Sequence, residues 1–480
     1  MGLFRKTLPL LWLGLGFALV PVDGWASEGH AVPHLEGARL SLIWGVPFIG
    51  ILLSIAMGPL LFPHFWEHHF GKVSMFWALC FIVPYTLLDG ATAAAYQLLH
   101  TALLEYFPFI ILLFTLFTVA GGVRLKGALV GTPMVNTTFL LIGTLIASWM
   151  GTTGASMLLI RPLIRAIENR RYKIHVIVFF IFLVSNIGGS LTPLGDPPLF
   201  LGFLKGVDFF WPTVHLLVPT VVAESLLLGL FFVLDAYLYG RERGTARQGV
   251  GRTGESLGLE GSVNILLLGV IVGAVLMSGM WQPGVAWTFF HVEVELQNMV
   301  RDGLLLVIAA LSLGVTQAES RTANGFTWGP ILEVAKLFAA IFVTIIPVIA
   351  ILRAGTNGAL AAVVSAVTGA DGQPVNAAYF WFTGILSSFL DNAPTYLVFF
   401  NTAGGEAPVL MGSMATTLAA ISMGAVFMGA NSYIGNAPNF MVRAIAEERG
   451  VKMPSFFGYM AWSVGILVPL FVLLTFLFFR

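Results

Sequence analysis

The sequence predicts an all-α polytopic membrane protein made of two inverted-topology repeats, each with a re-entrant hairpin and a broken transmembrane helix. Three observations support this fold class: the composition, the breaks inside apolar segments, and an internal match between the two halves. Of the 480 residues, 57% are hydrophobic and 10% are charged, against roughly 25% charged in soluble domains. The mean hydropathy is +0.89. So few charges cannot cover a water-facing surface.

Apolar runs long enough to cross roughly 30 Å of hydrocarbon recur along the chain. Lys and Arg mark cytoplasmic loops, and they gather in the segments 161–173, 241–252 and 443–452, whereas 281–302 and 353–377 are poor in them. The net charge of zero gives no electrostatic case for a nucleic-acid partner. Cys80 is the single cysteine, which excludes an intrachain disulfide and a Cys-rich metal site.

The first 26 residues have the features of a secretory signal peptide. The basic pair Arg5 and Lys6 precedes an apolar stretch, and Ala26 precedes a polar segment. The alternative is an uncleaved first helix. The remaining chain is expected to divide into N-terminal scaffold helices (27–123), a first repeat core (124–237), a cytoplasmic linker (238–261), further scaffold helices (262–332) and a second repeat core (333–480).

Each repeat core contains two interrupted apolar stretches. Polar and helix-breaking residues near the middle of 136–166 and 378–403 predict re-entrant hairpins, and 174–204 and 409–446 are predicted to be broken helices. An ungapped shift of 240 residues places Ser148-Trp-Met on Ser388-Phe-Leu and Gly195-Asp-Pro-Pro on Gly435-Asn-Ala-Pro. Because the hairpins open to opposite sides, the repeats are inverted, which is typical of secondary transporters with a site near the midplane.

The first break, Ser185 to Pro198, lies between two apolar stretches and therefore at membrane depth. It contains three prolines and three glycines, which cannot continue a helix. Unwound backbone at this depth is tolerated only where protein buries it or where it lines a cavity. Its carbonyl and side-chain oxygens suit a hard cation such as sodium. The second break, 429–439, repeats this chemistry.

Polar side chains of both breaks and both hairpin tips form the predicted ion or substrate site. Asp196 and Asp391 are the principal candidates, because a carboxylate at membrane depth is costly and by default functional. Such a group holds either a proton or a sodium ion, which is the minimal chemistry of an antiporter. The other candidates are Asn186, Thr192, Thr152, Thr153, Ser388, Asn392, Asn431, Ser432 and Asn436.

Several of these carboxylates and imidazoles have alternative explanations. Asp196 and Asp391 could each cap the N-terminus of a half-helix and stay ionised. Glu224, at the middle of the span 213–237, could relay protons or be held by a neighbouring helix. The imidazoles of His64, His68 and His69 could reach a metal if they lie on a helix, although an aromatic belt with a polar rim is the default, with pH sensing as a weaker option.

The sequence gives no support for an enzyme. It contains no P-loop pattern, so ATP-driven transport by this chain is unsupported. No Ser/His/Asp or HExxH arrangement points to an intramembrane hydrolase. No cofactor is expected beyond Na⁺ and H⁺ as transported or coupling ions.

At four motifs the sequence resembles the ion transporter superfamily, which includes NhaD-type sodium/proton antiporters, arsenite exporters, citrate–metal symporters and divalent-anion/sodium symporters. Within that group it resembles bacterial proteins described as sodium/proton antiporters or citrate transporters. The resemblance covers nearly the whole chain after residue 40. The motifs are SNIGGSLTPLGDPP, SSFLDNAPTYLVFF, GANSYIGNAPN and PHFWEHHFGK.

The resemblance implies a homodimer with a scaffold domain and a mobile transport domain. The transport domain would hold both hairpins and both broken helices and move as an elevator. In the dicarboxylate branch each hairpin tip carries a Ser-Asn-Thr triplet that grips substrate carboxylates. Here the tips read Gly151-Thr152-Thr153 and Asp391-Asn392-Ala393. A carboxylate at the second tip would repel an anionic substrate and favours a cation.

The first hypothesis is therefore exchange of Na⁺, or also Li⁺, for H⁺ across the bacterial inner membrane. The alternative is sodium- or proton-coupled symport of citrate or a dicarboxylate. The expected partners are the lipid bilayer, small inorganic cations and a second copy of the chain.

Overall fold

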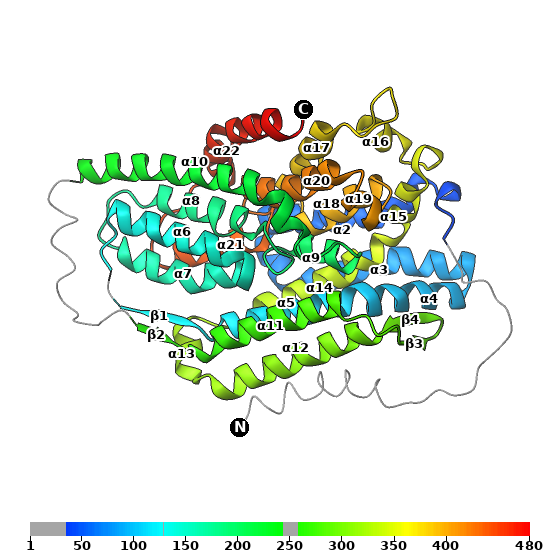
Figure 1. Cartoon of the computed structure of the whole chain (residues 1–480), viewed down its shortest axis with the longest axis horizontal. Helices are drawn as coiled ribbons and strands as arrows, with labels where there is room; N and C mark the ends of the chain where they lie inside the picture. The colour runs from blue at the N-terminus through cyan, green and yellow to red at the C-terminus, as the bar shows by residue number, and fades with distance from the viewer. Residues whose placement is uncertain (1–34, 128, 243–257) are drawn as a thin grey trace. The chain divides into compact units, whose positions relative to one another are not determined.

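The computed structural model describes residues 35–127, 129–242 and 258–480, and these residues are almost entirely helical (Figure 1). The predicted signal peptide at 1–26 and most of the linker 238–261 lie outside them. Short 3-10 turns, η2 (Gly37–Arg39) and η3 (Leu42–Gly45), precede the first long helix. The next helices are α2 (Val46–Leu61), α3 (Pro63–Asp89), α4 (Ala91–Thr101), the π-helical turn η4 (Ala102–Tyr106) and α5 (Phe107–Ala120).

The first interrupted segment contains five helices and one 3-10 turn. They are α6 (Pro133–Met150), α7 (Thr152–Ala166), α8 (Ile174–Leu183), η5 (Ile187–Gly189), α9 (Pro197–Leu204) and α10 (Trp211–Arg241). Helices α6 and α7 meet at Gly151, whose φ of +82° is a conformation that favours glycine. Pro197 and Pro198 begin α9, where the missing N–H groups cost nothing.

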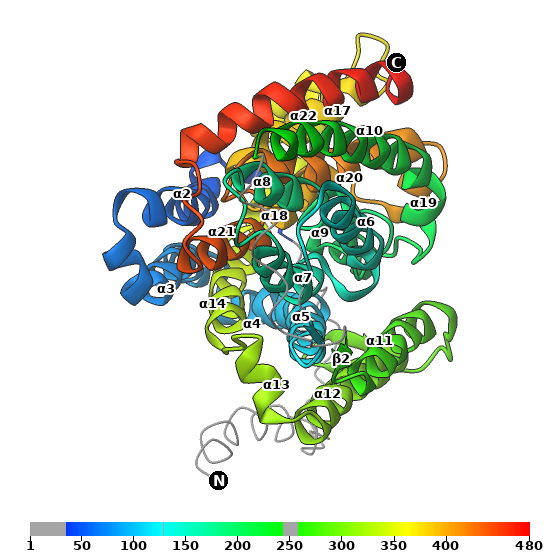
Figure 2. The same cartoon turned by 90° about the vertical axis from the view of Figure 1, so that its left-hand side faces the viewer.

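The middle of the chain adds two long helices and the two short ribbons. Helices α11 (Val263–Met280) and α12 (Leu296–Val315) pack against each other and against α5 (Figure 2). They are joined by the antiparallel strands β3 (Ala286–Phe289) and β4 (Val292–Glu295). Strands β1 (Arg124–Lys126) and β2 (Gly258–Glu260) pair antiparallel. Hydrogen bonds from Lys126 and Arg124 lower the pKa of Glu260 in this ribbon.

The second interrupted segment follows α13 (Ala318–Ala323), α14 (Gly329–Thr344), α15 (Ile346–Arg353), η6 (Gly355–Asn357) and α16 (Ala361–Ala366). It contains α17 (Asn376–Phe389), α18 (Asn392–Thr402), α19 (Ala407–Met411), α20 (Ala415–Met428), η7 (Gly429–Asn431), α21 (Ala437–Glu448) and α22 (Phe456–Phe478). Helix α22 packs against α10, and both figures show the two side by side (Figures 1 and 2).

Within the described residues, eight helices are long and apolar enough to cross a membrane. The bent pair α14 and α15, with an angle of 41° between them, would be a ninth span. The prediction of a polytopic membrane protein is therefore confirmed, although the two β-ribbons show that the chain is not purely α. Helix α6, predicted as one leg of a re-entrant hairpin, also qualifies as a span by length and hydropathy.

Helix α8 is buried over almost its whole length. From Val176 to Val184 every side chain is 0% exposed, as expected for a helix that is hydrophobic all round. It contacts α6, α10 and α21, and it also contacts the turns η5 and η7. In contrast, the span that contains α3 is only 17% buried, so its outer face is apolar and suited to lipid. Helix α8 thus lies in the interior of the protein, whereas α3 lies at its periphery.

Gly195 allows two backbone stretches of the first break to approach closely. A Cβ at this position would overlap the carbonyl oxygen of Gly189 and lie 2.7 Å from its carbonyl carbon. Gly195→Ala is therefore expected to lower the unfolding free energy by about 1–3 kcal/mol, measured as a lower thermal midpoint of the purified protein. Gly229→Ala on α10 is the control, since its Cβ would meet nothing within 4 Å. Equal midpoints for the two variants would contradict the close approach.

Candidate functional site

Asp196 lies at the end of the first break, directly before α9. Its backbone is extended, with φ −140° and ψ 142°, and the two following prolines start the helix. The side chain is 1% exposed. A carboxylate buried to this degree needs polar partners, and the fold supplies them from three other elements.

Three donors hold the Asp196 carboxylate. Thr152 Oγ1, at the N-terminus of α7, donates to Oδ1 over 3.0 Å. Asn436 Nδ2, just before α21, donates to the same oxygen over 2.9 Å. Asn392 Nδ2, at the N-terminus of α18, donates to Oδ2. Asn392 and Asn436, which lie 196 and 240 residues further along the chain, thus meet the carboxylate of Asp196 in the fold.

Three asparagines extend this network between the two breaks. Asn186 Nδ2 donates to Asn439 Oδ1 over 2.7 Å, and Asn436 Nδ2 also lies 3.3 Å from Asn186 Oδ1. Asn439 Nδ2 donates to the carbonyl oxygens of Gly429 and Ser432, each over 2.9 Å. The side chains of Asn186 and Asn439 are 0% exposed. The amides therefore satisfy backbone groups that the broken helices leave without helical partners.

Three hydrogen bonds at the first break recur at the second, at an offset of 240 residues. In the first, Thr192 Oγ1 donates to Ser148 O, Leu194 N to Thr192 Oγ1, and Ser148 Oγ to Gly188 O. In the second, Ser432 Oγ donates to Ser388 O, Ile434 N to Ser432 Oγ, and Ser388 Oγ to Met428 O. Asn431 Nδ2 also donates to Ser388 Oγ over 2.9 Å. The hydroxyls of Thr192, Ser388 and Ser432, which are predicted site residues, thus join each break to the first helix of its hairpin.

A cavity of about 100 Å³ lies beside Asp196. It is lined by the tip of the first hairpin and the first break, including Thr152, Thr153 and Asp196, and by residues of α5, α14 and α21. Among the described residues that line it there is no Lys, Arg or His. The apolar members from α5 and α14 are Leu112, Leu113, Leu116, Phe117, Pro330, Ile331 and Val334. The cavity therefore lies where the hairpin tip and the first break meet α5 and α14.

Asp391 is placed as an N-terminal cap of α18. Its Oδ1 accepts from Ala393 N over 3.1 Å, which is the alternative that the sequence left open for both carboxylates. It directly precedes Asn392, whose side chain donates to Asp196. At the matching end of α7 the residue is Gly151, and no side chain caps that helix. At the N-cap position, the second hairpin tip thus has a capping carboxylate and the first has none.

Glu224 lies on the buried side of α10 and is 9% exposed. One turn earlier, Thr220 Oγ1 lies 2.8 Å from Ser190 Oγ in the first break. Among the described residues, no hydrogen bond or ion pair involves the Glu224 carboxylate. The structure therefore places it next to the break without showing a partner, and its role as a proton relay stays a prediction.

His64, His68 and His69 all lie on α3, and the imidazoles of His68 and His69 each bond to a backbone carbonyl one turn earlier. His68 Nδ1 is 2.9 Å from the carbonyl oxygen of His64, and His69 Nδ1 is 3.1 Å from that of Phe65. These contacts follow the turns of α3 instead of joining the imidazoles around one point. Across residues 35–127, 129–242 and 258–480, no group of three His, Cys, Asp or Glu side chains could hold a metal ion. The metal role suggested for His64, His68 and His69 therefore gains no support from the described residues and stays a prediction.

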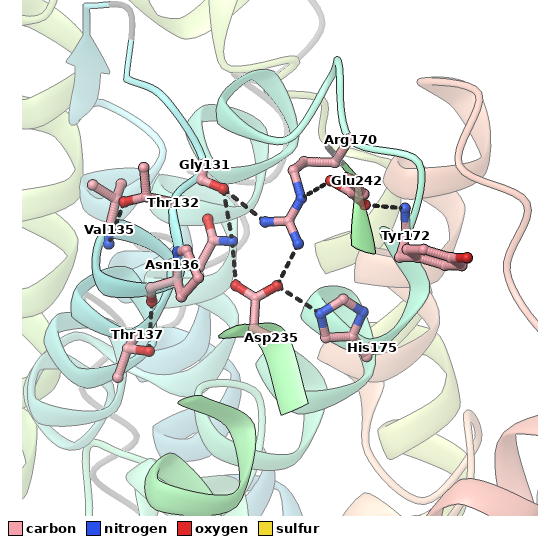
Figure 3. A network of polar contacts seen from close by, with 11 residues as sticks. Gly131, Thr132, Val135, Asn136, Thr137, Arg170, Tyr172, His175, Asp235 and Glu242 are labelled. Carbon is pink, nitrogen blue, oxygen red and sulfur yellow. Dashed lines mark hydrogen bonds and ion pairs between the residues drawn. The ribbon is translucent and has the colours of Figure 1, made fainter. Parts of the chain in front are cut away.

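A buried ionic network joins α10 to the segment between α7 and α8 (Figure 3). Arg170 donates to Asp235, Glu242 and the carbonyl oxygen of Gly131 over 2.7, 2.6 and 2.7 Å. His175 Nε2 lies 2.8 Å from Asp235 Oδ1. This network is not among the features predicted from the sequence. Asp235 lies inside the predicted span 213–237, and a carboxylate in a span was the available signal.

A protein-family model described as "Putative citrate transport" matches residues 37–479. An uncharacterized transporter of Mycobacterium tuberculosis and one of Mycobacterium bovis are each 27% identical over 334 residues, covering 67% of this chain and 72% of the relative. A 46 kDa membrane protein of Mycobacterium leprae is 25% identical over 348 residues, covering 70% and 75%.

These findings place the protein among multi-pass membrane transporters and not among enzymes. The chain belongs to the family described as citrate transport, which the family model matches over nearly its full length. That description supports the carboxylate alternative better than sodium/proton exchange. Nothing in the comparisons points to NhaD-type antiporters or arsenite exporters.

Proposed function

We propose that this protein is a secondary active transporter in which a sodium ion, in competition with a proton, binds at Asp196 and drives transport of a citrate-type carboxylate. The observation that carries the proposal is the buried carboxylate of Asp196, which accepts hydrogen bonds from Thr152, Asn392 and Asn436 and lies beside a cavity. A charged group at this depth is retained for function.

Oxygen atoms around Asp196 support the cation. Asn392 donates its Nδ2 to Asp196, and its Oδ1 is buried without a hydrogen-bond partner among the described residues. A buried acceptor without a donor costs roughly 1–3 kcal/mol, and a cation would satisfy it. Carboxylate, amide and hydroxyl oxygens together form the ligand set that hard cations prefer.

The difference between the hairpin tips supports the carboxylate. Asp391 supplies a negative charge to the N-terminus of α18, whereas the N-terminus of α7 has no side-chain cap and faces the cavity through Thr153. Helix N-termini attract anions, and half-helices in transporters point at anionic substrate groups. A substrate carboxylate would then take at α7 the position that Asp391 takes at α18. The description of the family agrees with such a substrate.

The recurrence at 240 residues supports the two inverted repeats. Hydrogen bonds at both breaks match pair by pair, and inverted repeats with broken helices are typical of secondary transporters. The cavity between the hairpin tip and α5 and α14 agrees with a transport domain that moves against a scaffold. The resemblance to the ion transporter superfamily adds three parts to this proposal. The transport domain moves as an elevator, two copies of the chain form a homodimer, and the protein lies in the bacterial inner membrane.

A second candidate is sodium/proton exchange without an organic substrate. The cavity favours it, because about 100 Å³ is well below the roughly 300–1,000 Å³ of small-molecule pockets. The absence of Lys, Arg and His among the described lining residues also suits a cation better than an anion.

Transport assays in membrane vesicles that contain the protein distinguish the two candidates. Carboxylate transport predicts uptake of labelled citrate or a dicarboxylate that depends on a sodium gradient and exceeds that of empty vesicles. Exchange predicts that NaCl, but not choline chloride, collapses an imposed pH gradient while no carboxylate is taken up. The proposed coupling would be contradicted if, between pH 6.5 and 9, sodium changed neither the uptake of the labelled carboxylate nor the imposed pH gradient.

A further inference from the structure

Asp196 and Asn436 occupy matching positions in the two halves and touch each other. A shift of 240 residues takes one to the other, and Asn436 Nδ2 donates to Asp196 Oδ1 over 2.9 Å. Each residue ends a break and directly precedes a helix. Helix α9 begins with Pro197 and Pro198, and helix α21 has Pro438 at its second position. Their backbones agree: φ and ψ are −140° and 142° at Asp196, and −152° and 140° at Asn436. Matching residues of the two breaks are therefore in direct contact, as expected near a local two-fold axis that relates the breaks.

Of the two matching residues, only Asp196 has a carboxylate, whereas Asn436 has a neutral amide at the corresponding position. Asn436 has the size and shape of an aspartate, and it is 2% exposed. Its amide group reaches Asp196 Oδ1, Asn186 Oδ1 and the carbonyl oxygen of Ser185. No other ionisable side chain within the described residues is hydrogen-bonded to the pair. The remaining nearby carboxylate, Asp391, faces the positive N-terminus of α18.

We propose that Asn436 is a specificity-determining residue of the cation site, because as the neutral counterpart of Asp196 it limits the pair to one negative charge and restricts the site to one monovalent cation. This inference rests on the proposed cation site at Asp196. Divalent cations are held by several oxygens, and their affinity follows the number of charged ligands. One carboxylate with neutral oxygens matches the charge of a sodium ion. A second carboxylate in place of the Asn436 amide, whose Nδ2 lies 2.9 Å from Asp196 Oδ1, would match a divalent ion.

Two substitutions test the inference through cation selectivity. Asn436→Asp adds the second carboxylate and is expected to raise the affinity for Ca²⁺ or Mg²⁺ by about tenfold or more relative to Na⁺. Asp196→Asn combined with Asn436→Asp moves the single carboxylate to the matching position and keeps the total charge. This double variant is expected to restore the sodium response that Asp196→Asn alone removes. Because it adds no buried charge, it keeps the test open if Asn436→Asp fails to fold.

The measurement is the thermal midpoint of the full-length purified protein with NaCl, CaCl₂, MgCl₂ or choline chloride. Asn401→Asp is the matched control, since Asn401 is also buried and its Oδ1 accepts from Arg353 Nε over 2.8 Å. It should gain no stabilisation by divalent ions. Unchanged selectivity in Asn436→Asp, an equal gain in Asn401→Asp, or no sodium response in the double variant would overturn the inference alone. A wild-type protein that NaCl does not stabilise would overturn the proposed cation site as well.

Discussion

Asp196→Asn is expected to abolish sodium-coupled transport while the protein still inserts and folds. The neutral amide keeps the size of the side chain and can still accept from Thr152 or Asn436. What it loses is the attraction between carboxylate and cation, about 4 kcal/mol at 4 Å in a medium of effective dielectric constant ~20. That energy corresponds to about a thousandfold weaker cation binding. Vesicle transport and the amount of folded protein measure the two effects separately.

Two variants control this experiment. Asp208→Asn removes a carboxylate from the exposed segment between α9 and α10 and should leave transport unchanged. Asp391→Asn keeps a good helix cap, since Asn and Asp cap helices about equally well. Normal transport in Asp391→Asn would make Asp391 a cap alone, and loss of transport would make it part of the ion site. Normal transport in Asp196→Asn would contradict the proposed site.

Arg170→Gln is expected to destabilise the fold by about 3–5 kcal/mol, the usual cost of removing one partner from a buried ion pair. Asp235 and Glu242 are 0% and 5% exposed, and Arg170 is the cation that bridges them (Figure 3). Without it, two buried carboxylates near the C-terminal end of α10 lose their shared cation, and His175 and Asn136 remain as side-chain partners of Asp235 alone. The thermal midpoint of the purified protein measures the loss.

An exposed pair provides the control for Arg170. Arg443 and Glu447 are bonded one turn apart on α21, with side chains 24% and 43% exposed, and such pairs contribute about 0.3–0.5 kcal/mol. Arg443→Gln should therefore shift the midpoint far less. Adding Asp235→Asn and Glu242→Gln to Arg170→Gln removes the unpaired charges and should recover part of the loss. Equal midpoints for Arg170→Gln and Arg443→Gln would show that the network does not stabilise the protein.

The helix breaks could be predicted from the sequence because Pro and Gly have strong local effects. Pro193, Pro197 and Pro198 end and restart helices wherever they occur, so the interruption between α8 and α9 follows from the chain itself. Apolar spans are equally local, because each needs about 20 apolar residues in a row. The candidacy of Asp196 followed from its predicted depth.

The partners of Asp196 could not be predicted in the same way. Thr152, Asn392 and Asn436 meet it only after distant segments pack, and apolar periodicity does not say which segments pack together. The 240-residue match paired Asp196 with Asn436 by position but gave no contact between them. Arg170 was counted as one of several loop cations for the same reason, whereas the fold buries it to 4% exposure. Asp391 kept two explanations because capping and ion binding use the same residue type.

The most direct test of the cation site is equilibrium binding of radioactive sodium to the purified wild-type protein and to Asp196→Asn. A site where Na⁺ and H⁺ compete for one carboxylate predicts saturable binding to the wild type that weakens as the pH falls. It also predicts no saturable binding to Asp196→Asn. Binding that is equal in the two proteins, or absent from the wild type across pH 6.5–9, would contradict sodium coupling at Asp196.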